Sequence, residues 1–141
     1  MGERLVLVVA MIVVAGAAAV LLNRRRPAPP TRDSYETPRQ LDRSDFPRPE
    51  AGLLVVVFTS STCDSCAKVL ADVAALASDS VAIYEAEAVE HADLHRRYRI
   101  DAVPITVIAE REGVVQAAWV GSVAADELEA AVAALSEDSN G

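Results

Sequence analysis

Two cysteines are the residues of this sequence best suited to chemistry. Cys63 and Cys66 are separated by Asp64 and Ser65, and the chain of 141 residues has no other cysteine. At the start of a helix, two cysteines three positions apart lie close enough to form a disulfide. The unpaired N–H groups and positive dipole end of such a helix favour a thiolate on Cys63, and a thiolate attacks disulfides. Cys66, one turn further in, is suited to resolving the mixed disulfide that results.

The cysteine pair alone leaves two alternatives open. A zinc site would need two more ligands, which His91 and His95 could supply from one helix face. However, 24 residues separate Cys66 from His91, and the polar sequence around both histidines indicates a solvated surface. The other alternative is a pair of buried, unreactive cysteines. Four acidic residues could also be metal ligands, but we interpret them as a solvated edge: Glu85, Glu87, Glu90 and Asp93.

The charge and cysteine counts exclude several classes of protein. Residues 1–50 hold eight arginines against six acidic residues, a net charge of +2, whereas residues 51–141 hold five basic against fifteen acidic residues, or −10. A folded part this acidic argues against nucleic-acid binding, which requires lysine and arginine against phosphate. Two cysteines are too few for a disulfide-stapled scaffold or a four-cysteine metal centre.

The surrounding pattern places the cysteine pair between a buried strand and a helix. Residues 53–59, LLVVVFT, form a continuous apolar run typical of a central strand, and residues 63–77 have apolar positions at helical spacing. Further along we expect a strand at 81–87, a helix at 91–99, strands at 105–109 and 114–120 and a helix through 128–135. The order β-α-β-α-β-β-α predicts an α/β fold with a mixed central sheet flanked by helices.

A second motif gives the sequence a family resemblance. Residues 98–104, YRIDAVP, place a proline at the first residue of a strand, where a sheet tolerates it. With the C-x-x-C after its apolar strand, the hairpin glycine Gly113 and the pair Val120-Gly121, residues 53–135 resemble the thioredoxin family. The resemblance implies a thioredoxin-like fold in which Pro104 follows a cis peptide bond and faces the cysteines. It also implies that Val103 and Pro104 line the substrate groove.

The sequence departs from the family at several places. Thioredoxins usually have Trp-Cys-Gly-Pro-Cys, where this chain has Thr-Cys-Asp-Ser-Cys at residues 62–66. The negative charge of Asp64 is expected to raise the pKa of the neighbouring thiol, opposing the helix dipole. Thioredoxins also carry a buried aspartate six residues before the first cysteine, as proton acceptor for the second. Val57 stands there, and no obvious base replaces the aspartate.

The N-terminal segment predicts a membrane anchor. Residues 5–22 contain no charge, and as a helix they would extend about 27 Å, enough for a hydrocarbon core. A cleaved signal peptide and a buried soluble helix are the alternatives. Three arginines at 24–26 follow the apolar run and only Arg4 precedes it, which favours a cytoplasmic C-terminal part; an exported domain is the alternative.

We therefore expect four segments. They are a tail at residues 1–4, a transmembrane helix at 5–22, a linker at 23–52 that holds six of the seven prolines, and a thioredoxin-like domain at 53–141. The first strand and helix of a full thioredoxin would be missing or reduced, because the linker occupies their place.

The predicted function is that of a thiol–disulfide oxidoreductase tethered to the plasma membrane by a single helix. Its partners would be a protein disulfide or dithiol and an electron donor or acceptor, and the cysteine pair requires no cofactor or metal. A redox-inactive binding or scaffold module is the alternative. The richness in alanine, valine and arginine, with a single lysine, indicates a GC-rich bacterial source.

Overall fold

The computed structural model describes residues 1–24 and 35–138, apart from the side chains of residues 4–5 and 18–24. The chain divides into two compact units, Met1–Ser34 and Tyr35–Gly141. Residues 25–34 of the expected linker lie outside the described part of the chain.

Helix α1, Gly2–Arg24, covers the segment expected to span a membrane. Its described apolar side chains are exposed at consecutive positions around the helix: Val6, Leu7, Val8, Val9, Met11, Ile12, Val13 and Val14. Among the residues searched, which exclude the undescribed side chains of positions 5 and 18–22, no helix is long and apolar enough to cross a membrane. The transmembrane helix is therefore not confirmed and stays a prediction.

The second unit is built on a four-stranded sheet with the strand order β2-β1-β3-β4. The strands are β1, Leu53–Thr59; β2, Val81–Glu87; β3, Ile105–Glu110; and β4, Val115–Val120. Strands β1 and β2 run parallel and are joined by α2, Cys66–Ala74, whereas β3 is antiparallel to both β1 and β4. Helix α3, Ala92–Arg97, precedes β3, and α4, Ala125–Asp138, follows β4. The mixed sheet and the predicted order of elements are confirmed.

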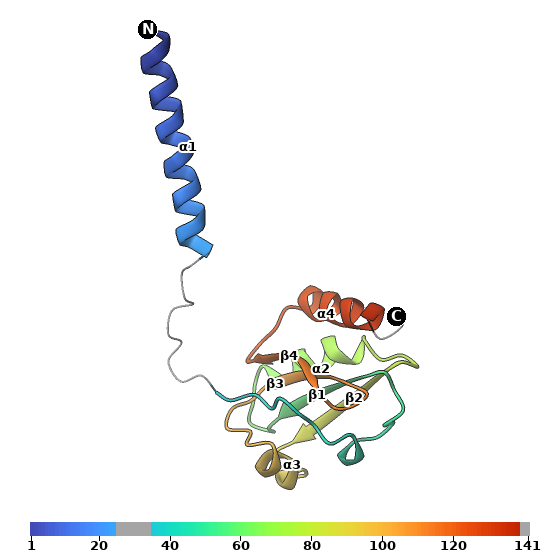
Figure 1. Ribbon diagram of the computed structural model, residues 1–141. Helices are drawn as coiled ribbons and strands as arrows, with labels where there is room; N and C mark the ends of the chain where they lie inside the picture. The colour runs from blue at the N-terminus through green and yellow to red at the C-terminus, as the bar shows by residue number, and fades with distance from the viewer. Residues whose placement is uncertain (25–34, 139–141) are drawn as a thin grey trace. The chain divides into compact units, whose positions relative to one another are not determined.

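The sheet separates two apolar layers, and β1 contributes to both (Figure 1). The α2 face is the side covered by α2 and α4, where β1 presents Leu53, Val55 and Val57. The α3 face is the other side, where β1 presents Leu54, Val56 and Phe58 beside Leu94 of α3. Because both faces are covered, all seven residues of β1 are buried, which explains the continuous apolar run in the sequence.

An N-terminal arm, residues 35–51, covers part of the α3 face. Leu41, Phe46 and Ala51 are buried there, and a short 3-10 helix, Arg43–Asp45, lies between the first two. Gln40 also forms an isolated bridge with Val114 beside β4. The structured unit thus starts well before residue 53, the expected start of the domain. The prolines of this arm flank apolar residues that pack on the sheet.

A buried arginine holds the arm in place. The Arg43 guanidinium donates hydrogen bonds to the carbonyl oxygens of Glu110 at 2.8 Å, Arg48 at 3.1 Å and Ala51 at 3.2 Å. Burial lowers the pKa of Arg43 from its ordinary value, since the charged form is held away from water. The arm is therefore bound to the end of β3 by a charged side chain that backbone carbonyls solvate in place of water.

Candidate functional site

The cysteine pair lies where β1 passes into α2. Cys63 N–H donates to the carbonyl of Ser60 at 3.1 Å, so residues 60–63 form a turn after the strand. A disulfide joins Cys63 and Cys66, whose Cα atoms are 5.5 Å apart. Cys63 is half-buried whereas Cys66 is only 3% exposed, so an approaching molecule reaches Cys63 first.

Helix α2 begins later than the sequence indicated. Its first residue is Cys66 rather than Cys63, because the turn at 60–63 delays the helix, and Ser65 is its N-cap without a side-chain capping hydrogen bond. Ser65 Oγ lies 3.8 Å from Cys63 Sγ, within reach of a weak hydrogen bond to sulfur. Cys63 thus precedes the helix but still lies at its N-terminal end, where positive potential favours a thiolate.

A cis proline lies at the same end of the sheet. The Val103–Pro104 peptide bond is cis, as the resemblance implied. Phe58 of β1 pairs with Ile105 of β3, so Pro104 comes next to the last residue of β1, where the cysteine loop leaves the strand. Pro104 is buried and Val103 half-buried, and the Pro104 carbonyl accepts a hydrogen bond from Gly121 N–H at 2.8 Å. The cysteine loop and the Val103–Pro104 loop therefore occupy adjacent positions at one end of the sheet.

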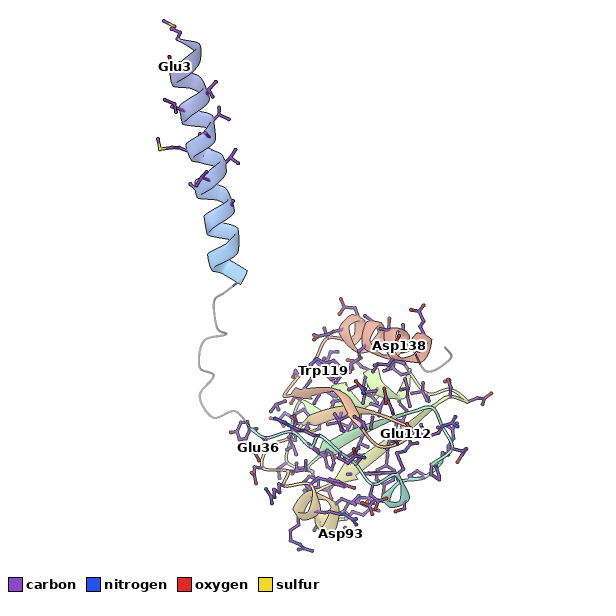
Figure 2. All side chains as sticks on the ribbon, viewed as in Figure 1. Glu3, Glu36, Asp93, Glu112, Trp119 and Asp138 are labelled. Atoms are coloured by element: carbon purple, nitrogen blue, oxygen red, sulfur yellow. A yellow bond between two sulfur atoms is a disulfide. The ribbon has the colours of Figure 1, made fainter. Side chains whose placement is uncertain are left out.

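A carboxylate braces the cysteine loop from the side of β2. The side chains of this unit are drawn in Figure 2. Glu87 Oε1 accepts a hydrogen bond from Ser61 N–H at 3.1 Å, and Oε2 accepts from Val89 and Glu90 N–H at 2.8 and 3.0 Å. These backbone donors, Glu90 first and then Val89, hold the pKa of Glu87 below its ordinary value. Sequence analysis missed this role because the contact with the cysteine loop joins Ser61 to a residue 26 positions further along the chain.

The family comparison gives these features a common origin. A family model of the thioredoxin-like domain matches residues 44–136, which is more than half of the chain. The chain belongs to the thioredoxin-like domain family. The match begins within the N-terminal arm and ends in α4, so it covers both faces of the sheet. It includes the close cysteine pair, an arrangement that supports thiol–disulfide oxidoreductase chemistry at the family level.

Solved thioredoxin structures share this fold. Oxidized thioredoxin O2 from Arabidopsis thaliana is 23% identical, with a TM-score of 0.53 over 62% of this chain and 78% of that chain. Oxidized mitochondrial thioredoxin 3 from Saccharomyces cerevisiae is 20% identical, with a TM-score of 0.51 over 60% and 80% of the two chains. A mutant thioredoxin from Halobacterium salinarum is 19% identical, with a TM-score of 0.52 over 61% and 76%. No curated protein matches the sequence.

In this thioredoxin-like domain, the position of the family's buried aspartate is apolar. Val57 is fully buried on the α2 face. Its neighbours across the sheet are polar: Glu85 on β2 and Thr106 on β3 pair with it in register. Thr59 Oγ1 donates to Glu85 Oε1 at 2.7 Å, and the buried Thr106 hydroxyl has no partner among the described residues. Val81 and Ile83 lie four and two residues before Glu85, so the three share one face of β2, whereas the register that sets Glu85 beside Val57 is given by the strand pairing alone.

The two histidines face inward rather than forming the solvated surface that the sequence suggested. His91 Nε2 lies 2.7 Å from the Tyr84 hydroxyl, and His95 Nε2 lies 2.7 Å from the Ala86 carbonyl oxygen. Both side chains are half-buried, and His95 also meets the Phe58 ring edge-on. Within residues 1–24 and 35–138, no group of ligating side chains is placed to hold a metal ion.

Proposed function

We propose that this chain is a thiol–disulfide oxidoreductase that acts on protein substrates through Cys63 and Cys66. The observation that supports this most directly is the Cys63–Cys66 disulfide at the N-terminus of α2, beside the cis Val103–Pro104 loop, in a domain of the thioredoxin-like family. The reaction needs no cofactor, since the two thiols together carry the two electrons that one disulfide exchange transfers.

The unequal exposure of the cysteines supports a division of roles. In the reductive direction, the Cys63 thiolate attacks a substrate disulfide, and one substrate sulfur leaves as a thiolate while the other stays bound to Cys63. Cys66 then attacks Cys63 Sγ, which releases the second substrate sulfur and forms the intramolecular disulfide. The same steps in reverse oxidise a substrate dithiol. An upstream partner supplies or removes the two electrons after each turnover.

The loop of Val103 and Pro104 is proposed to hold the substrate. It lies at the end of the sheet that the cysteine turn also occupies, and Val103 is half-buried. Beside it, Val120 is 42% exposed at the end of β4, next to Gly121. An extended peptide bound at this end of the sheet would present its sulfur to Cys63 while its backbone runs beside the proline loop.

The reduction potential of the full chain tests the proposal. The protein is equilibrated in thiol/disulfide buffers, its free thiols are alkylated, and the fraction with two alkylated cysteines is measured. We expect one two-electron transition between roughly −120 and −270 mV, the span of known thiol oxidoreductases. Failure to form the Cys63–Cys66 disulfide at any buffer ratio would overturn the proposal.

A redox-inactive binding module is the second candidate, and the apolar side chain of Val57 favours it. A variant with Cys66→Ser separates the two, because it cannot resolve a mixed disulfide at Cys63. An oxidoreductase would accumulate discrete mixed disulfides with protein substrates, and these would disappear in the double variant Cys63→Ser/Cys66→Ser. A binding module would accumulate no such mixed disulfides with either variant.

We also propose that residues 5–22 anchor the protein in the plasma membrane with the domain in the cytoplasm. The support is the uncharged sequence, the apolar side chains exposed around α1 and the arginines that follow at 24–26. The substrates would then be reached from the membrane. Labelling of Cys63 in intact cells by a membrane-impermeant thiol reagent would instead place the domain outside the cytoplasm.

A further inference from the structure

The proposed reaction requires Cys66 to lose its proton. An ordinary thiol has a pKa of about 8.5, so the resolving cysteine is mostly protonated at neutral pH and reacts slowly unless a base takes the proton. Cys66 is 3% exposed, which restricts direct access of bulk water to its sulfur. Val57, at the position of the family's acid, has no group that could accept a proton. Any side-chain base for Cys66 would therefore come from a position other than 57.

We propose that Glu85 is the proton acceptor for Cys66, an assignment that rests on the proposed function. In the parallel pairing of β1 and β2, Glu85 is the register partner of Val57. Val81 and Ile83, four and two residues earlier on β2, pack in the α2 face with Val69 and Val73 of α2. Because side chains alternate along a strand, Glu85 projects to that same face. The Glu85 carboxylate thus lies on the strand next to Val57, the position at which thioredoxins carry their buried aspartate.

Thr59 holds this carboxylate at the end of β1 from which the cysteine turn departs. Thr59 is the last residue of β1 and is 1% exposed, and its Oγ1 donates to Glu85 Oε1 at 2.7 Å. Thr59 lies on the α2 face with Val57, two residues further along β1 and so closer to the turn that leads to Cys63 and Cys66. The hydrogen bond holds Oε1 at the end of β1, where the turn that leads to α2 begins. The Glu85 side chain is otherwise exposed at the edge strand, so it can return its proton to solvent after each turnover.

The other charged groups near this position are either paired elsewhere or lie beside Cys63. Glu87, the next residue on the same face of β2, accepts three backbone N–H groups. On α2, Lys68 Nζ is paired with Asp72 Oδ2 at 2.6 Å. Asp64 is exposed within the cysteine turn, beside Cys63 rather than Cys66 in sequence. Of the carboxylates that β2 presents on the α2 face, Glu85 is the one whose hydrogen bond comes from the end of β1.

Atoms and electrons balance in the resolving step. The Cys66 S–H proton passes to the Glu85 carboxylate, and the Cys66 sulfur supplies the electron pair for the new bond to Cys63 Sγ. The bond between Cys63 Sγ and the substrate sulfur breaks, and that sulfur leaves with its electron pair as a thiolate. Glu85 then releases the proton to solvent or to the leaving thiolate. The dithiol is oxidised and the substrate disulfide is reduced, with no other reactant.

The resolving step can be measured on its own with glutathione disulfide. The reduced full chain is mixed with excess reagent, quenched in acid at timed intervals and weighed by mass spectrometry, which separates the Cys63–glutathione adduct from the internal disulfide. Rate constants for adduct formation and for resolution are obtained at pH values from mildly acidic to alkaline. The variants are Glu85→Gln, Thr59→Val and, as a control for loss of one nearby charge, Glu90→Gln.

We expect Glu85→Gln to slow resolution about 100-fold at pH 6, the lower end of the effects attributed to a general base. Its rate should then rise steeply with pH, following thiol ionisation, and approach the wild-type rate at alkaline pH. Thr59→Val should slow resolution about threefold in the same direction, through misplacement of the carboxylate, and Glu90→Gln should match the wild type. Unchanged rates of adduct formation and equal thermal unfolding midpoints would show that the variants are folded.

Two results would overturn the assignment. The first is the same pH profile of resolution in Glu85→Gln and wild type. The second is a shifted profile in Thr106→Val with none in Glu85→Gln, which would show that proton transfer depends on the unpartnered hydroxyl of β3, as a relay, and not on Glu85. Failure of the proposed function looks different, because the wild-type chain would then form no glutathione adduct at Cys63 at any pH.

Discussion

The two faces of the sheet differ in how they are closed. On the α3 face, the N-terminal arm is held by polar contacts: Arg43 binds three carbonyls, and the Tyr98 hydroxyl accepts from Asp42 N–H while donating to Asp45. On the α2 face, two helices cover an apolar layer that ends at the cysteine pair. The α3 face therefore serves mainly stability and the α2 face the proposed chemistry, although both share the buried strand β1.

This separation predicts that single changes can damage one function without the other. The chemistry should respond to changes around Cys63, and the stability should respond to changes where the arm meets the sheet. The expected effects are ordered below from the largest to the smallest.

Cys63→Ser should abolish reaction with disulfides and leave the fold intact. Because the serine hydroxyl is a far weaker nucleophile than a thiolate, formation of the glutathione adduct should fall by more than about 1,000-fold. The free energy of unfolding of the reduced chain should change by less than about 0.5 kcal/mol, since the side chain is half-exposed. Adduct formation by mass spectrometry and urea denaturation measure the two effects. Adduct that persists on Cys66 would show that the attacking role belongs to the other cysteine.

Gly113→Ala should lower stability and leave the reaction with disulfides intact. Gly113 has φ of +83°, and a Cβ there would overlap the carbonyl oxygen of Leu41, whose N–H donates to Gly113 O. The arm and the β3–β4 turn would have to separate, which we expect to cost about 2–4 kcal/mol of unfolding free energy. Reaction of Cys63 with disulfides should be unchanged at temperatures where the variant is folded.

Gly52→Ala is the matched control for this change. A Cβ at Gly52 would meet only the Ser80 carbonyl oxygen, at the ordinary contact distance of 3.6 Å. Its urea midpoint should stay close to that of the wild type. Equal losses for both glycine variants would show that the arm does not hold the α3 face.

Alkaline pH should loosen the arm through Tyr98. Burial, and then the hydrogen bond to Asp45, raise the pKa of Tyr98 from 10.0 to about 12. The neutral phenol is therefore favoured in the folded state, so its contribution to stability is complete below the unfolded pKa of 10.0 and is lost as the pH rises toward about 12. Urea denaturation across this alkaline range should show the loss in the wild type. Tyr98→Phe should be about 1 kcal/mol less stable at neutral pH and should lack that part of the alkaline dependence.

Asp64→Asn should produce the smallest effect, and only on the chemistry. Removing the charge beside Cys63 favours its thiolate, so alkylation of the reduced chain at neutral pH should become about two- to threefold faster. Glu137→Gln, near the C-terminal end of α4, removes the same charge and should leave the rate unchanged. A slower Asp64→Asn variant would contradict the expected influence of that carboxylate.

Much of the fold could be predicted because local patterns carried it. The expected bounds of β1 and β2 agree with the structure, since both begin with apolar residues and end at polar turns. The helices α2 and α3 were predicted too long: α2 begins at Cys66, and α3 ends at Arg97, two residues before Arg99, which has φ of 54°. Periodicity cannot find such ends, because turn and helix residues of similar polarity give the same pattern.

The arm was missed for a different reason. A stretch with several prolines and mixed charge has the composition of a linker. Only three of its described apolar residues are buried against the sheet. Whether such residues are buried depends on a free sheet face elsewhere in the chain. Leu41, Phe46 and Ala51 fill the part of the α3 face that the short helix α3 leaves uncovered.

The sequence by itself determined the order of elements along the chain, the C-x-x-C at a strand–helix junction and the cis proline implied by the family motif. These depend on neighbours within a few residues, whose types fix backbone conformation. Only the tertiary structure decided that the arm covers the α3 face, that Glu87 braces the cysteine turn and that Glu85 and Thr106 flank Val57. Such contacts depend on strand register and on which face each side chain takes, and residues 26 to 49 positions apart become neighbours only once the sheet has formed.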